Sequence, residues 1–138
     1  CVSAVLAEGE AGQISHEGRP NLGTGFVMSD DDLITLDPTT AAECLYNTCD
    51  DDAVAWAVAR LGPQPLITLQ GTPTAAAWKA KDSTYVVCAD DMAVHPDLQR
   101  IMARRCGSVV EWPTDHSPFL CRPALVGELL AGLATSPA

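Results

Sequence analysis

The chain has 138 residues, 47% of them hydrophobic, so it is long enough for one domain with a buried core and too short for two ordinary domains. Eight basic residues stand against 18 acidic ones, a formal net charge of −10. This balance argues against a nucleic-acid or anionic-membrane partner, because both need a cationic surface. No apolar run approaches the roughly 20 residues of a membrane span and no signal peptide is visible, so we expect a cytoplasmic protein.

The first forty residues are poorly periodic and predict irregular structure with room for one short hairpin. Asp30, Asp31 and Asp32 form an acidic cluster that we interpret as a solvated loop rather than a metal site. The chain begins with Cys1 rather than Met, which indicates a processed, trimmed or partial product.

Two helices are expected next, over residues 38–46 and 51–61. The segment Thr40-Ala41-Ala42-Glu43 fits a capping box for the first, and Asp50 is a good N-cap for the second. A short Ala-rich helical turn over residues 74–79 completes this half of the chain.

The second half shows a clearer pattern. Residues 84–89 form an apolar, β-branched run typical of a strand buried on both faces of a parallel sheet. A helix over 97–106, a second strand over 108–112 and a final helix from Pro123 to Leu133 follow. The order β–α–β–α predicts parallel strands joined by right-handed crossover helices.

The six cysteines lie at positions 1, 44, 49, 88, 106 and 121. An even count is compatible with three disulfides, but Cys88 and Cys106 fall in segments typical of buried apolar residues, which favours reduced thiols. No Cys-x-x-Cys occurs, and the histidines lie far from Cys44 and Cys49 in sequence. We therefore expect no metal site and no cofactor.

Polar residues follow both predicted strands of the second half. Asp90 and Asp91 come after the first strand, and Asp115 and His116 come after the next. Carboxyl ends of parallel strands meet at one edge of a sheet, where catalytic groups gather. A carboxylate there can fix the tautomer of an imidazole and stabilise the imidazolium. A histidine in a Thr-Asp-His-Ser-Pro turn, taken alone, would more often cap a loop.

The order of acid and histidine is that of the closing half of a Ser…Asp…His triad. Residues 85–91, 95–100 and 115–120 closely resemble the C-terminal part of α/β-hydrolases. The subgroup that the sequence is most similar to contains small carboxylesterases, plant methylesterases and hydroxynitrile lyases. The resemblance is close over residues 80–134 and weaker over 38–80, which resembles the helical lid of that subgroup.

The resemblance implies an α/β fold: the C-terminal part of an α/β-hydrolase, with parallel strands and crossover helices preceded by a helical lid. The lid segment would span residues 1–80, and the α/β core units would span 81–138. Asp91 would be the triad acid, because it stands five residues before Pro96, and His116 would be the triad base. The implied substrate-pocket residues are Trp78, Met92, Phe119 and Leu120.

The same resemblance implies hydrolysis of small carboxylic esters. Hydroxynitrile lyases of the subgroup have a lysine directly after the histidine, where this chain has Ser117, which favours hydrolase over lyase activity. Hydrolase, lyase and acyltransferase outcomes nevertheless share this half of the site.

The sequence lacks a nucleophile of the expected kind. None of its serines, at positions 3, 15, 29, 83, 108, 117 and 136, lies in a Gly-x-Ser-x-Gly elbow, and no His-Gly-Gly oxyanion segment occurs. Two parallel strands would also leave long edges unpaired. We therefore expect a complementary N-terminal half outside this chain, or self-association. The alternatives are a non-catalytic, hydrolase-like binding module and, more remotely, catalysis by Cys1 as an N-terminal nucleophile.

Overall fold

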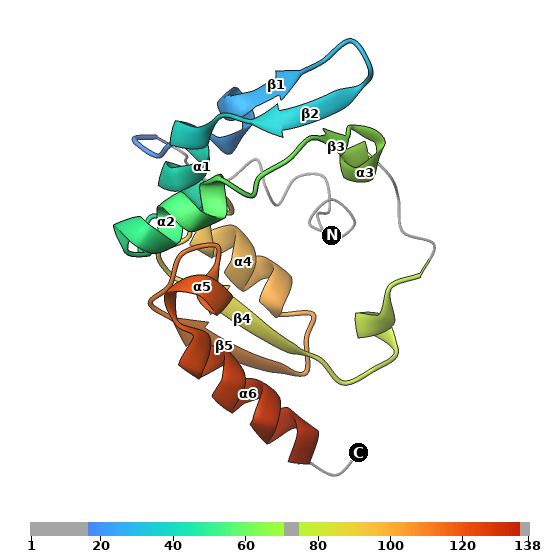
Figure 1. Ribbon diagram of the computed structural model, residues 1–138. Helices are drawn as coiled ribbons and strands as arrows, with labels where there is room; N and C mark the ends of the chain where they lie inside the picture. The colour runs from blue at the N-terminus through green and yellow to red at the C-terminus, as the bar shows by residue number, and fades with distance from the viewer. Residues whose placement is uncertain (1–16, 71–74, 136–138) are drawn as a thin grey trace.

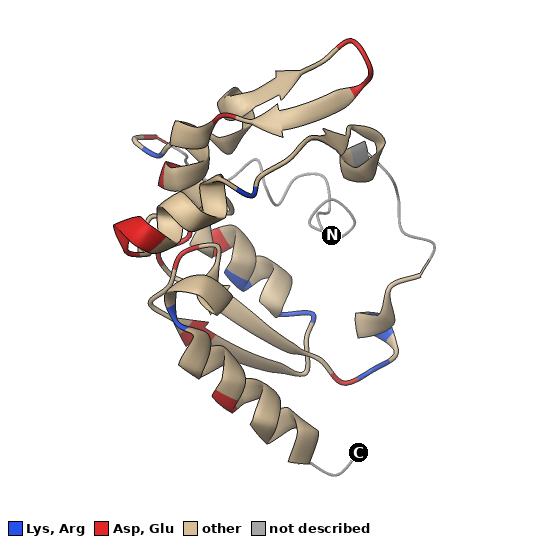
Figure 2. Cartoon of the chain, viewed as in Figure 1, with Lys and Arg blue, Asp and Glu red and all other residues tan. Residues whose placement is uncertain are grey.

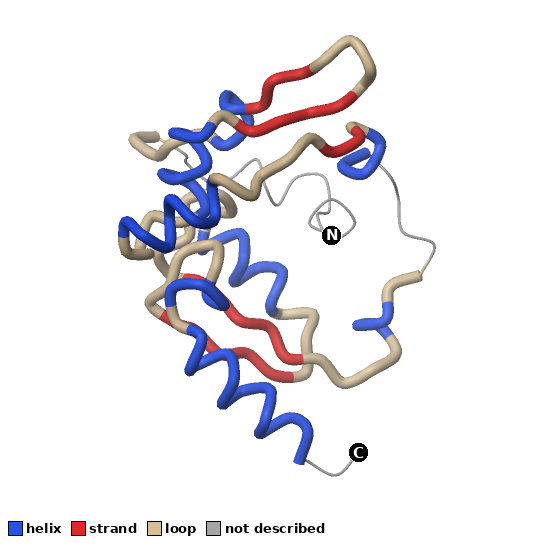
Figure 3. Tube along the Cα trace, in the orientation of Figure 1, coloured by secondary structure: helices blue, strands red, loops and turns tan. Residues whose placement is uncertain are grey.

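A computed structural model describes residues 17–70 and 75–135 of the chain (Figure 1). Within these residues a small antiparallel sheet with two helices precedes a parallel strand pair with its own helices. Figure 3 shows that helix and strand alternate along the C-terminal part, as the sequence predicted. The α/β fold class with parallel strands is confirmed.

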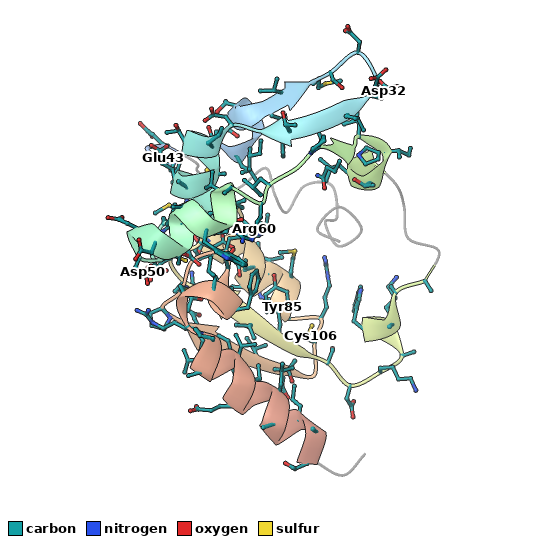
Figure 4. All side chains as sticks on the ribbon, in the orientation of Figure 1. Asp32, Glu43, Asp50, Arg60, Tyr85 and Cys106 are labelled. Carbon is teal, nitrogen blue, oxygen red and sulfur yellow. The ribbon has the colours of Figure 1, made fainter. Side chains whose placement is uncertain are left out.

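The antiparallel sheet contains the short hairpin that the sequence left room for. Strand β1 (Phe26–Met28) pairs with β2 (Leu33–Leu36), and β3 (Gln64–Pro65) pairs with the other edge of β2. The acidic cluster lies in the hairpin turn, where Asp30, Asp31 and Asp32 are all exposed. Asp32 has a φ of 56°, a left-handed conformation that aspartate tolerates better than most residues. Figures 2 and 4 show this acidic tip well away from the parallel strands.

Helices α1 (Pro38–Leu45) and α2 (Asp51–Val58) lie where two helices were predicted. The capping-box prediction for Thr40–Glu43 is wrong, because Asp37 is the N-cap and its Oδ1 accepts the N–H of Thr40 at 2.9 Å. Pro38 occupies the first position of the helix, so the N-cap is the residue before it, Asp37, and Thr40 lies inside the first turn. Asp50 caps α2 as predicted.

Between α2 and β4, the described residues form strand β3 and two short helical elements. Helix α2 ends at Val58, three residues before the predicted end. The next two hydrogen bonds, from the N–H groups of Arg60 and Leu61, reach back three residues rather than four. Helix α3 (Ile67–Gln70) was not predicted. The helical turn expected over residues 74–79 is a 3-10 helix over Ala77–Lys79, and Thr74 lies outside the described residues.

The parallel pair positions the site. Strands β4 (Thr84–Cys88) and β5 (Ser108–Trp112) run in register from Thr84 opposite Ser108 to Cys88 opposite Trp112. Helix α4 (Pro96–Ala103) connects them and packs on β4, where Val87, Leu98 and Met102 form the core. The loops that follow β4 and β5 therefore begin at the same edge of the sheet.

Two further helices end the described part, α5 (Pro118–Cys121), which was not predicted, and α6 (Pro123–Thr135). They pack against each other. Large apolar side chains are exposed on both helices and on β5, namely Phe119 on α5, Leu130 and Leu133 on α6, and Val109 on β5. None of the helices in the described ranges is both long and apolar enough to cross a membrane.

Candidate active site

Two loops at the carboxyl ends of β4 and β5 bring an acid and a histidine together. Asp91 follows β4 by three residues and His116 follows β5 by four. The Nδ1 atom of His116 lies 2.9 Å from Oδ2 of Asp91, across 25 residues of sequence. The sequence placed these two residues at one edge of the sheet, and the structure joins them directly. The neighbouring Asp90 is exposed, and its backbone carbonyl accepts a hydrogen bond from the side chain of Asn47.

The carboxylate of Asp91 is buried, with only 2% of the residue exposed, and is surrounded by donors. Its Oδ1 accepts the N–H groups of Ala93 at 2.7 Å and of Val94 at 2.9 Å. Its Oδ2 accepts a hydrogen bond from the side chain of Gln99 at 2.8 Å, in addition to facing His116. A buried carboxylate with this many donors is held in one orientation and stabilised as an acceptor.

The imidazole of His116 combines a buried partner with access to solvent. The hydrogen bond to Asp91 raises the pKa of His116 above 6.5, although burial acts in the opposite direction. With 39% of its side chain exposed, the ring can still exchange a proton with a bound molecule. Because Nδ1 faces the carboxylate, Nε2 is the atom that is placed for that exchange.

Asp115, directly before the histidine, connects its loop to the segment between α1 and α2. The residue is fully buried, and its carboxylate accepts the N–H groups of Thr48 and Ser117, each at 2.9 Å. Burial acts to raise the pKa of Asp115, but the hydrogen bonds outweigh it, and the pKa lies below the ordinary value. Asp115 thus holds the two segments together, whereas the hydrogen bond to the imidazole comes from Asp91.

Two thiols also donate to Asp115. The sulfur of Cys49 lies 3.4 Å from Oδ2, and that of Cys121 lies 3.3 Å from Oδ1. Burial and the carboxylate of Asp115 raise the pKa of Cys49 to about 12, so this thiol keeps its proton at neutral pH. The sulfurs of Cys49 and Cys121 and a carboxylate oxygen of Asp115 lie within 4.8 Å of one another, a spacing at which such atoms could hold a metal ion. Sequence spacing had not indicated this cluster, and the expectation of no metal stays a prediction.

The cysteines that the structure describes, residues 44, 49, 88, 106 and 121, are free thiols. Cys88 is buried as expected, whereas Cys106 is only half-buried at the end of the turn that follows α4. Cys1 lies outside the described residues, and so does His16. His95 is half-buried and caps α4 through Nδ1, which accepts the N–H of Asp97.

A cavity of about 280 Å³ opens beside His116. Its apolar lining comes from β4, α4 and α5, and includes Tyr85, Met102 and Phe119 (Tyr85 is labelled in Figure 4). Of the four predicted pocket residues, Phe119 lines this cavity. Met92 lines a separate cavity beside residues 19–23 instead, whereas Trp78 and Leu120 line neither.

The sequence placed Asp115 beside His116 but did not indicate its hydrogen bonds, and sequence reasoning missed Gln99 and the backbone of Thr48 as parts of this site. Gln99 had a detectable signal, because it stands three residues before Met102 and four before Ala103, both buried on α4. A polar residue on a buried helical stripe needs a hydrogen-bonding partner. The contact with Thr48 had no signal, since it links positions 67 residues apart.

No serine in the described residues hydrogen-bonds to His116. Ser117, the nearest in sequence, is buried, and its N–H donates to Asp115. Among the described residues, the site thus pairs a buried carboxylate with a partly exposed imidazole.

The sequence of the chain matches one family of known proteins. The model of the alpha/beta hydrolase family matches residues 4–128. The alpha/beta hydrolase nvfD of Aspergillus novofumigatus is 32% identical over 138 residues, covering 97% of this chain and 54% of that protein. The chain thus spans about half the length of this relative.

Solved structures share the fold at lower identity. Polyneuridine aldehyde esterase superposes with a TM-score of 0.65 at 16% identity, covering 79% of this chain and 47% of that one. The pyrethroid hydrolase PytH gives a TM-score of 0.66 at 18% identity, covering 98% of this chain and 55% of that one. Because the family model matches most of this chain, the chain belongs to the alpha/beta hydrolase family.

Proposed function

We propose that this chain supplies the acid and base of a Ser-His-Asp site that hydrolyses small carboxylic esters. The observation that carries the proposal is the 2.9 Å contact between Nδ1 of His116 and the buried carboxylate of Asp91. This is the arrangement that a triad needs, because the carboxylate orients the ring and stabilises the imidazolium that forms during acyl transfer. The esterase and hydrolase structures that share the fold support the same class of reaction.

The mechanism follows from the position of the ring. Nε2 of His116 takes the proton of a serine hydroxyl as its oxygen attacks the ester carbonyl, and returns that proton to the leaving alcohol. The same nitrogen then activates the water that hydrolyses the acyl-enzyme. In this mechanism the carboxylate of Asp91 does not take up the transferred proton; it orients and stabilises the protonated ring.

The serine and the oxyanion donors come from outside residues 1–138 in this proposal. A complementary N-terminal half, or a second copy of the chain, would add strands beside the parallel pair β4–β5. The exposed Val109, Phe119, Leu130 and Leu133 support such a partner, because apolar surface in one part of a chain marks an interaction site.

The substrate class rests on the cavity beside His116. Its lining is mainly apolar, with Tyr85, Met102 and Phe119 contributing large side chains, and its volume of about 280 Å³ suits a small acyl or alkyl group. A small, largely apolar ester fits these properties.

The test is nitrophenyl-ester turnover by the complete protein. His116→Ala and Asp91→Asn should each lower kcat on the order of 10³-fold or more, since either change disables the proton transfer. Asp90→Asn is the matched control, because its exposed carboxylate is one residue away and should leave turnover unchanged. Wild-type rates in both site variants would rule out the assignment, and no ester turnover by the unaltered complete protein would favour a non-catalytic binding module.

A further inference from the structure

Gln99 occupies an unusual position for a polar side chain on a helix. It lies on α4, is only 4% exposed, and is surrounded by polar atoms from β4 and from the loop that carries Asp91. Its Nε2 lies 2.8 Å from Oδ2 of Asp91 and 2.9 Å from the carbonyl of Val94. Its Oε1 accepts the N–H of Cys88, the last residue of β4, at 2.9 Å.

These contacts settle the orientation of the amide. Oε1 faces an N–H donor, whereas Nε2 faces oxygen acceptors, and exchanging the two atoms would replace every hydrogen bond by a repulsive contact. The two hydrogens of Nε2 therefore point toward Asp91 and Val94. Gln99 thus connects the end of β4, the turn after it and the Asp91 carboxylate through one rigid amide.

We propose that Gln99 is a positioning residue that holds Oδ2 of Asp91 toward Nδ1 of His116. The backbone N–H groups of Ala93 and Val94 restrain Oδ1, and Gln99 adds a donor at Oδ2, so a turn about the Cβ–Cγ bond breaks hydrogen bonds at both oxygens. Gln99 is the buried side chain that restrains the second oxygen, and it does so on the oxygen that His116 uses. The inference rests on the proposed role of the Asp91–His116 pair.

The consequence is a fixed tautomer of neutral His116. With Oδ2 held as an acceptor, the ring keeps its proton on Nδ1 and leaves Nε2 free to accept one. Without Gln99 the carboxylate turns, the bond to Nδ1 weakens, and the neutral ring moves to the tautomer with the proton on Nε2. The positioning role therefore predicts a spectroscopic signature as well as an effect on activity.

The first measurement uses the unaltered chain. In a pH titration by NMR, the side-chain NH₂ resonances of Gln99 should show an inflection at the pKa of His116, because both groups share Oδ2 of Asp91. A titration of His116 without any response of the Gln99 amide would overturn the proposal. This measurement needs no variant and therefore does not depend on a variant's folding.

The second measurement compares Gln99→Met with Leu98→Ala, both read by the ¹⁵N shifts of His116. Gln99→Met keeps the length of the side chain and removes its donors, so the neutral ring should change tautomer and the pKa of His116 should fall toward 6.5. Leu98→Ala loses buried volume on the same helix without touching Asp91, so it should keep the wild-type tautomer. An unchanged tautomer in Gln99→Met, or an equal change in Leu98→Ala, would overturn the proposal.

Activity of the complete protein separates this proposal from the proposed function. If esters are turned over, Gln99→Met should lower kcat about tenfold or more, since the orientation of Asp91 acts on the proton transfer. Gln99 also lines the cavity beside His116, so a rise in KM with unchanged kcat would show a substrate contact instead and would overturn the positioning role. If no ester is turned over while the tautomer still depends on Gln99, the proposed function fails and the positioning role stands.

Discussion

The two halves of the described chain bury their residues in different ways. In the C-terminal half, Val87 and Cys88 at the end of β4 and the stripe of α4 with Leu98 and Met102 are buried against one another. In the N-terminal half, all three residues of β1 are exposed, and Ile34 is the buried residue of β2. Asp91 and His116 thus lie in the half with more buried residues, which suits groups that must keep a fixed geometry.

The halves are joined near the site by polar contacts. Asn47 donates to the carbonyl of Asp90, the N–H of Thr48 donates to Asp115, and the guanidinium of Arg19 donates to the carbonyl of Asp91. All three contacts reach the loops that carry Asp91 and His116. The contacts between the two halves therefore also restrain the loops that carry Asp91 and His116.

The largest expected effect contrasts the two cores. Met102→Ala and Ile34→Ala each remove a buried side chain, and changes of this kind cost about 2–5 kcal/mol of unfolding free energy. Met102→Ala should destabilise β4 and β5 together with α4, whereas Ile34→Ala should open β1–β3 and leave β4–β5 protected. Hydrogen exchange of strand amides, resolved by residue, measures both. Equal loss of protection in both sheets from either change would show one cooperative core.

The polar junction should have the next largest effect. Asp115→Asn replaces one acceptor oxygen by a donor, which leaves a buried N–H of Thr48 or Ser117 without a partner and should cost about 1–3 kcal/mol. Urea unfolding measures the change, and the exposed Asp90→Asn should stay within about 0.5 kcal/mol of the wild type. A stability loss in Asp115→Asn no larger than that of the control would mean that the junction contributes little.

The same contrast explains what the sequence could predict. The strands and helix around the site follow from local signals: the apolar run of β4, the spacing along α4, and turn residues after each strand. The pairing of Asp91 with His116 followed from topology, because a single crossover puts both at one edge. The hydrogen bonds of Asp115 with Thr48 and of Gln99 with Asp91 were missed because no local pattern connects these segments, and α5 was too short to give a periodic signal.

Titration should separate the acid–base pair from the junction. The pKa of His116 lies above 6.5 because of Asp91, so the pair stabilises the fold fully below that pH and loses this contribution as the pH rises through the pKa of the folded state. Asp115 behaves in the opposite sense: its lowered pKa stabilises the fold above 3.8, and this contribution is lost as the pH falls through the pKa of the folded state.

Unfolding free energies between about pH 3 and pH 8 measure both contributions. Asp91→Asn should flatten the dependence above pH 6 and leave the acid limb unchanged, whereas Asp115→Asn should reduce the acid limb. A wild-type slope above pH 6 in Asp91→Asn would remove the Asp91 contact as the cause of the His116 shift.

The smallest expected effect lies on the surface of the packed half. Arg100 on α4 forms ion pairs with Asp97 and with Glu111 on β5, each with an N–O distance of 2.6 Å, and all three side chains are largely exposed. Solvent and salt screen such pairs, and ordering the long side chains costs conformational entropy. Arg100→Gln should therefore shift the urea midpoint far less than Met102→Ala, although both residues lie on α4. Adding salt should shrink the difference further, and a loss as large as that of Met102→Ala would show that the pair, rather than the buried stripe, holds α4 against the sheet.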